Sequence, residues 1–217
     1  MNLLELFREE DIEELQIHEK RIGLYVLERA IDRMDMPEKV KQQLQYVISS
    51  QLHKDKIGSI LEKIVEARRA INTHYKANGV REVFESNEKV IYLLNPCNTE
   101  SDFNSFILTI SSIIDTDLSK FNSHVTIPPG LRGSINIYEL YLNNTHGSGG
   151  FNSNIIQNLK DINILRSKKF PTHLDTPVWK EKVQELGFEF PVKDWKGLSS
   201  KCLEIYLESL TNILATF

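Results

Sequence analysis

Arg166 and His173 are the residues whose types and spacing could carry out chemistry in this chain of 217 residues. They stand on either side of six residues in the run Ile-Leu-Arg-Ser-Lys-Lys-Phe-Pro-Thr-His, which spans 164–173. In RNA cleavage without a metal, a base must take the 2′-hydroxyl proton and a cation must stabilise the charge on the phosphate. Histidine and arginine suit these two tasks. A loop histidine beside a solvated helix end is the alternative that the spacing alone leaves open.

Hydroxyl and amino groups next to the pair are candidates for contact with the same phosphate. Serine and threonine hydroxyls can donate hydrogen bonds to phosphate oxygens, and lysines attract the negative charge. The range 160–182 holds six basic residues against three acidic ones, so positive charge surrounds the pair. An ordinary solvated face explains such a local excess equally well. The candidate substrate-binding residues are Ser167, Lys168, Lys169 and Thr172.

A second arginine–histidine spacing occurs earlier in the chain. Arg68 and Arg69 precede His74 with five and four residues between. The apolar periodicity predicts one helix that contains all three, and side chains five or six positions apart lie on different faces of a helix. A surface helix of mixed charge is therefore the preferred interpretation of this pair.

The composition is that of an ordinary soluble globular protein, 41% hydrophobic and 26% charged. The net charge of −4 argues against a surface coated in basic charge for tight, nonspecific nucleic-acid binding. No apolar run reaches the roughly 18–20 residues that span a bilayer, and the acidic N-terminus is unlike a signal peptide. Two distant cysteines, Cys97 and Cys202, make neither a disulfide framework nor a zinc site. We expect a cytoplasmic protein without a metal, a cofactor or a membrane contact.

Helical periodicity dominates the sequence and predicts an all-α fold. Thr99 or Ser101 can cap one helix, with Asp102 favouring its positive end. Thr176-Pro177 predicts the start of another helix, and Gly187 its end. The predicted helices span 10–35, 38–53, 57 to a stop at 78–79, 99–118, 131–143, 152–165, 176–186 and 194–214.

Residues 80–95 differ from this pattern. They are rich in β-branched and aromatic side chains, which predicts a small β-hairpin or two short extended pieces. Asn95-Pro96 then breaks the chain. We expect an N-terminal helical region over 1–98 and a helical bundle over 99–217.

The C-terminal part resembles the HEPN superfamily, whose helical bundles include many RNases of toxin–antitoxin, abortive-infection and CRISPR-linked defence systems. The residues that carry the resemblance are Leu165-Arg166, six intervening residues and His173, and they follow an Asn- and Leu-rich helix. They precede the run at 186–195 and a long closing helix. The resemblance covers roughly the range 99–217, and Ser167 stands where the family often has asparagine.

This resemblance implies a metal-independent endoribonuclease in which Arg166 binds the scissile phosphate and His173 acts as general base or acid. It also implies RNA as substrate, a homodimer with two motifs across one cleft, and a cognate antitoxin or defence-system subunit as partner. Some members of the superfamily have lost activity. A non-catalytic helical interaction or RNA-binding module is therefore the alternative, and the amphipathic stretch 17–34 supports it because such a face can bind a partner chain.

Overall fold

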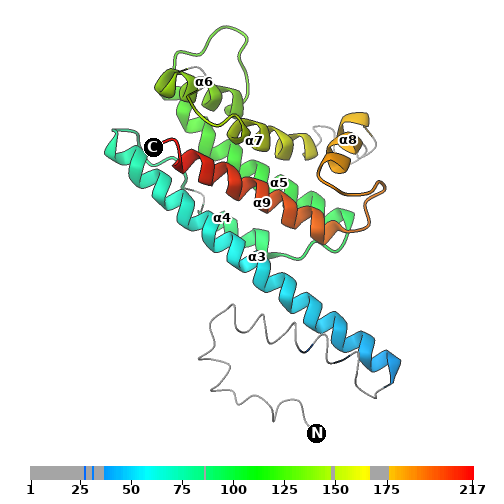
Figure 1. Ribbon diagram of the computed structural model, residues 1–217. Helices are drawn as coiled ribbons and strands as arrows, with labels where there is room; N and C mark the ends of the chain where they lie inside the picture. Colours follow the sequence, from blue (N-terminus) through cyan, green and yellow to red (C-terminus); the bar gives the residue numbers. More distant parts are fainter. Residues whose placement is uncertain (1–26, 28–30, 32–36, 86, 148–149, 167–175) are drawn as a thin grey trace, which may run out of the picture. The chain divides into compact units, whose positions relative to one another are not determined.

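The computed structural model describes residues 27, 31, 37–85, 87–147, 150–166 and 176–217. Within them it has seven α-helices and two short 3₁₀ helices, with no β-strand, which confirms the predicted all-α fold (Figure 1). The elements are α3 (Glu38–Ala77), α4 (Asn87–Val90), η2 (Ile91–Leu94), α5 (Glu100–Leu118), η3 (Ser119–Ser123), α6 (Ser134–His146), α7 (Asn154–Leu165), α8 (Pro177–Glu185) and α9 (Trp195–Leu214).

The chain divides into two compact units, 1–59 and 60–217, with the division inside α3. The sequence predicts two helices over the range of α3, but the structure has one helix of 40 residues. The helix continues through Gly58. A single glycine destabilises a helix by only about 1 kcal/mol relative to alanine, so it does not have to end the helix. The predicted boundary near 95–98 stays a prediction.

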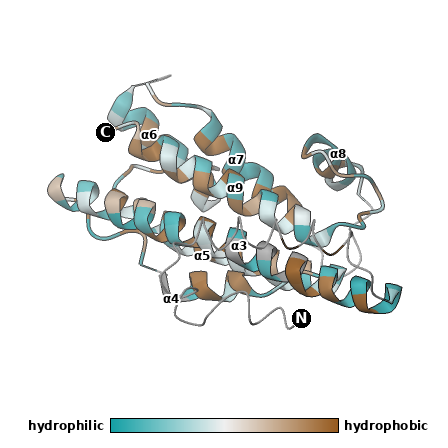
Figure 2. Ribbon diagram, turned by 60° about the horizontal axis from the view of Figure 1, so that its bottom comes forward, coloured by the Kyte–Doolittle hydropathy of each residue, from teal (hydrophilic) through white to brown (hydrophobic). Residues whose placement is uncertain are grey.

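The core of the second unit is built on α5, α7 and α9, which pack on one another (Figure 1). Helix α6 packs on α5 and α7, and α8 packs on α7. Each helix has an apolar face that turns inward and a polar face that stays outside, so hydrophilic and hydrophobic residues alternate along the ribbon (Figure 2). Large side chains at the centre that are almost fully buried are Phe103, Ile110, Phe121, Tyr138, Trp179 and Tyr206.

The helix ends follow the local signals in the sequence. Thr99 and Asp102 form a capping box, in which the Thr99 hydroxyl accepts from the Asp102 amide and the Asp102 carboxylate accepts from the Thr99 amide. Thr176 caps α8, and Pro177 takes its first position. Gly187, with φ of 89°, follows the end of α8, since this backbone conformation favours glycine. These predictions are confirmed.

The predicted hairpin at 80–95 is wrong. Residues 87–94 form α4 and η2, and the preceding residues 81–85 are not helical. The Asn72 side chain holds this stretch: its oxygen accepts from the amides of Val83 (3.0 Å) and Phe84 (2.9 Å), and its nitrogen donates to the Phe84 carbonyl (3.0 Å). The buried side-chain amide of Asn72 thus supplies hydrogen-bond partners to this non-helical backbone.

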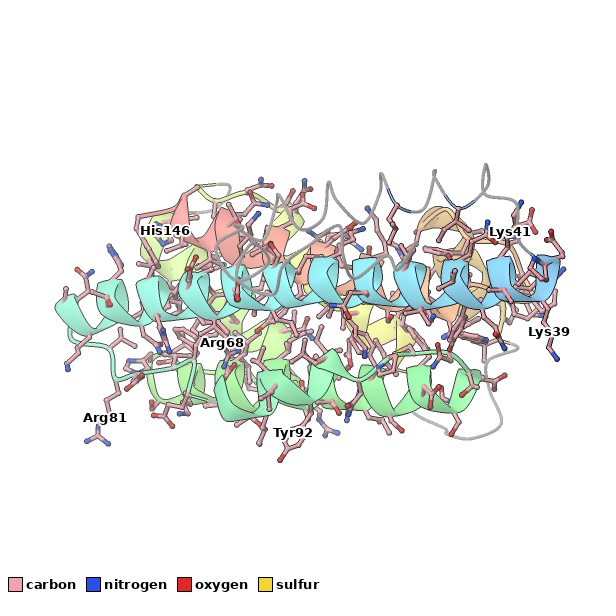
Figure 3. The ribbon with its side chains drawn as sticks, turned by 90° about the horizontal axis from the view of Figure 1, so that it is seen from below. Lys39, Lys41, Arg68, Arg81, Tyr92 and His146 are labelled. Atoms are coloured by element: carbon pink, nitrogen blue, oxygen red, sulfur yellow. The ribbon has the colours of Figure 1, made fainter. Side chains whose placement is uncertain are left out.

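A charged network lies inside the second unit. Arg68 Nη1 donates to Asp117 Oδ2 at 2.6 Å and to the Tyr206 hydroxyl at 2.9 Å, and both charged side chains are 0% exposed. The guanidinium also lies over the Phe84 ring, 5.4 Å from its centre. Figure 3 shows Arg68 between α3 (cyan) and α5 (green). The expectation of a surface helix is therefore wrong for Arg68, whose burial needs the carboxylate that α5 supplies.

Both cysteines are buried in the second unit. Cys97 is 2% exposed and Cys202 is 0% exposed, and neither forms a disulfide. Burial raises the pKa of both thiols, because a thiolate loses its hydration there; for Cys97 a hydrogen bond with Ser199 partly offsets the rise. Both side chains therefore act as small apolar core residues.

Candidate functional site

Arg166 is placed by the end of α7. Leu165 is the last residue of this helix, and the backbone of Arg166 turns away from helical geometry, with φ of −80° and ψ of 75°. Its amide still donates to the Ile162 carbonyl, at 3.2 Å. The change in direction leaves the side chain 35% exposed at the surface of the bundle.

Three helices meet at the Arg166 side chain. Asp115, near the end of α5, accepts from Arg166 Nη1 through Oδ2 and from the Ser134 hydroxyl through Oδ1, the latter at 2.7 Å. Ser134 is the first residue of α6. One carboxylate therefore fixes the guanidinium relative to the end of α7 and the start of α6. We call these three residues the Arg166 cluster.

Much of the Arg166 guanidinium remains available in this arrangement. An arginine has five N–H donors, and within the described part of the chain Arg166 uses only Nη1, toward Asp115. The donors on Nε and Nη2 can therefore present a planar edge to an oxyanion. Since Asp115 is itself 44% exposed, water screens the ion pair and its strength is modest.

The start of α6 adds positive potential beside Asp115. Gly133 precedes the helix with φ of 89°, and no side chain caps the first turn. The Ser134 hydroxyl, which would be near these amides, donates to Asp115 instead. The amide groups of a first helical turn carry a partial positive charge, so this end of α6 and Arg166 both favour an anion near Asp115.

The other predicted site residues lie outside the described residues: Ser167, Lys168, Lys169, Thr172 and His173. The two ends of the segment that carries them are described. The indole Nε1 of Trp179, in α8, donates to the Leu165 carbonyl at 3.2 Å, and Trp179 is 1% exposed. This hydrogen bond joins the last residue of α7 to the first turn of α8.

The positive charge predicted over 160–182 is partly neutralised by acids in the described structure. Lys182 pairs with Asp161 at 2.9 Å and with Glu185, and Lys160 pairs with Glu139 at 2.8 Å. Burial lowers the pKa of Lys182, but the two carboxylates outweigh it and raise this pKa overall. With Arg166 paired to Asp115, this surface attracts an anion less strongly than its sequence suggests.

The second arginine–histidine spacing does not form a site. Arg68 is in the buried network, whereas Arg69 is exposed. The His74 ring stacks on Phe217, with 3.6 Å between ring centres and 7° between planes. The side chains of Arg68 and His74 therefore serve two different packing roles.

Sequence reasoning missed the acidic residues of α5. Asp117 is fully buried with Arg68, and Asp115, which is 44% exposed, accepts from Arg166. Arg166 lies 51 positions after Asp115, so no local pattern could link them. The described residues contain no group of three or more histidine, cysteine or acidic side chains that could hold a metal ion.

Comparisons of the chain with protein families, with curated proteins and with solved structures find no match. None of the described helices has the length and apolar character that a membrane crossing requires.

Proposed function

We propose that this protein is a metal-independent endoribonuclease of a defence or toxin–antitoxin type system. Arg166 would bind the scissile phosphate, and His173 would act as general base and acid. The observation that carries the proposal is the state of Arg166: one nitrogen is fixed by Asp115, while the remaining donors are available at an exposed helix end. In the sequence, His173 follows Arg166 after six residues, and the Trp179–Leu165 hydrogen bond joins α7 to α8 on either side of that segment.

The reaction that suits these groups needs no metal. A base removes the proton of the ribose 2′-hydroxyl, the 2′-oxygen attacks phosphorus, and the bond to the 5′-oxygen breaks. The leaving 5′-oxygen takes up a proton, so the products are a 2′,3′-cyclic phosphate and a 5′-hydroxyl. The guanidinium stabilises the added negative charge on the phosphate oxygens. Ser167, Thr172, Lys168 and Lys169 are proposed as further phosphate contacts.

Asp115 has a positioning role in this proposal. Its carboxylate fixes the guanidinium through Nη1 and is itself fixed by Ser134, so the free edge of Arg166 points in one direction. A substrate phosphate would then meet a preorganised fork. We expect the active protein to be a homodimer that brings two such clusters to one RNA, with a cognate antitoxin or defence-system subunit as a further partner.

The test is cleavage of mixed cellular RNA by the purified protein in excess EDTA. Wild type should produce fragments with 2′,3′-cyclic phosphate ends. His173→Ala should lose about 10²–10⁴-fold in rate, and Arg166→Lys should also be severely impaired because lysine lacks the planar fork. Lys160→Ala is the matched control, since it removes another ion-paired cation from α7.

Wild-type cleavage that His173→Ala and Arg166→Lys leave unchanged would refute this site. Absence of cleavage by wild type, alone and with its purified partner, would favour the non-catalytic interaction module. One observation supports that second candidate: Ile91 and Tyr92 in η2 are 62% and 63% exposed, which is unusual for large apolar side chains side by side.

A further inference from the structure

A groove lies between η2 with its following loop and one face of α5, remote in sequence from the Arg166 cluster. Its volume is about 610 Å³, which is within the range of sites that hold a small group or side chain. All of it belongs to the second unit. The residues that line it are Tyr92, Asn95, Pro96, Asn98, Asp102, Ser105, Phe106 and Thr109.

The groove has flat, apolar surfaces. Phe106 is 5% exposed and supplies a buried aromatic surface, while Tyr92 is 63% exposed and Pro96 is also exposed. Figure 3 shows the Tyr92 side chain extending away from the helices, so its ring faces are accessible. Such a ring binds another flat group, or a cation, through its face.

Asp102, Ser105 and Thr109 offer acceptors to the groove, while Asn95 and Asn98 line it with side-chain amides that both donate and accept. Asp102 Oδ2 accepts from the amides of Asn98 and Thr99, both at 3.0 Å, and an ionised carboxylate has lone pairs left for further donors. The hydroxyl protons of Ser105 and Thr109 are given to backbone carbonyls, at 3.2 and 2.8 Å, so their oxygens have lone pairs left. A ligand with several N–H donors fits this set.

The charge of the groove favours a cationic ligand over an anionic one. Among the described residues, no lysine, arginine or histidine lines it, and Asp102 contributes a negative charge. Hydrogen bonds from Thr99 and Asn98 lower the pKa of Asp102, which keeps the carboxylate ionised. The first turn of α5 also carries Glu100, whereas the other two acids of this helix, Asp115 and Asp117, are paired with arginines. A phosphate would be repelled here, whereas a planar cation would pair with Asp102 and stack on Tyr92.

We propose that this groove binds the guanidinium of an arginine side chain that a partner protein presents, with apolar residues on either side of that arginine. The exposed side chains of Ile91 and Leu94, 62% and 42% exposed, flank the groove on η2 and would cover those apolar neighbours. Arginine is favoured over lysine because its planar group both stacks and donates several hydrogen bonds. The proposal is independent of the ribonuclease proposal, since it uses none of the residues of the Arg166 cluster.

The probe is the capped tripeptide acetyl-Leu-Arg-Leu-amide, titrated into the full-length protein and followed by amide NMR shifts. We expect affinity on the order of millimolar, with shifts concentrated at Asn95, Asn98, Ser105 and Thr109. The matched peptide with lysine should bind about threefold or more weakly. The peptide with citrulline, a neutral isostere of arginine, should show no saturable binding because it cannot pair with the carboxylate.

Two variants test the groove without touching the capping box. Tyr92→Ala removes an exposed ring and should weaken binding of the arginine peptide about fivefold. Thr109→Lys places a cation in the groove and should abolish binding, while far-UV circular dichroism and the unfolding temperature stay close to wild type. Shifts that are equal for arginine and citrulline, or unchanged binding by Thr109→Lys, would overturn the proposal. Tighter binding of adenosine monophosphate at the same amides would assign the groove to a nucleotide and overturn it too.

Discussion

Replacing Asp117 by asparagine should destabilise the second unit more than almost any other conservative change. The substitution keeps the shape of the side chain but removes its charge, so the buried Arg68 cation loses the carboxylate that pairs with it. Both side chains are 0% exposed, so water cannot take over the role of the carboxylate. Breaking a buried ion pair by removing one partner typically costs about 3–5 kcal/mol.

The surroundings of Arg68 set the expected value toward the lower end of that range. Tyr206 still accepts from Arg68 Nη1, and the Phe84 ring still lies against the guanidinium. The neutral side-chain oxygen of the asparagine can also still accept one hydrogen bond from the Arg68 guanidinium. We therefore expect about 3 kcal/mol for Asp117→Asn. For a unit of this size, about 2–4 °C of unfolding temperature is lost per kcal/mol, so the transition should fall by roughly 10 °C.

The double variant Arg68→Met with Asp117→Leu separates the charge from the packing. It removes both ions and fills their space with apolar side chains, so it should lie within about 1–2 kcal/mol of wild type. The sum of the two single variants would predict a far larger loss, and the difference is the coupling between the residues. Arg69→Met is the matched control, because it removes an exposed arginine from the same turn of α3.

The assay is urea unfolding of the full-length protein followed by tryptophan fluorescence. Trp179 is buried in the second unit, and Trp195 packs on Phe103 with 5.5 Å between ring centres, so both indoles report on this unit. If Asp117→Asn unfolds within 1 kcal/mol of wild type, as Arg69→Met should, the reasoning fails. The pair would then be hydrated in solution and not sealed in the core.

Three further perturbations follow from contacts of the second unit. Burial, with the charge of Asp117, raises the pKa of Tyr206 to about 12 despite the opposing effect of Arg68, and an unfolded tyrosine titrates near 10. The neutral phenol therefore contributes its full stability below about pH 10, and this contribution is lost as the pH rises toward 12. In Tyr206→Phe, the free energy of unfolding should depend less on pH over this range. Asn72→Ala removes the partners of two backbone amides and one carbonyl, so it should cost about 2–4 kcal/mol and speed hydrogen exchange at the Phe84 amide by at least tenfold. Thr99→Ala breaks the capping box and should cost about 1 kcal/mol in urea unfolding, and Thr99→Ser should restore most of it.

Local signals in the sequence predicted the helix ends well. The Thr99 cap, the Thr176-Pro177 start and the Gly187 end each depend on residues within one turn, so their physics is contained in a short stretch of sequence. The hairpin prediction for the segment 80–95 was wrong for the opposite reason. Its β-branched and aromatic composition suits a strand, but contact with Asn72 from α3 and the bundle decided its conformation.

The role of Arg166 and its spacing to His173 stay a prediction, whereas its position at a helix end is as expected from the sequence. The sequence contained no sign that Asp115 and Ser134 would hold its side chain, because the three residues come from three different helices. The burial of Arg68 was missed for the same reason: exposure of a charged residue depends on whether a distant part of the chain supplies its counter-ion.

The two buried cysteines have a practical consequence for labelling. Since Cys97 and Cys202 are 2% and 0% exposed and burial raises the pKa of both thiols, few thiolates exist at neutral pH to react with a maleimide. The two native cysteines should therefore react little with thiol-specific reagents. A cysteine introduced at the exposed position of Leu94 would take up a fluorophore or spin label selectively, and it would place that reporter at the edge of the groove without any need to remove the native cysteines.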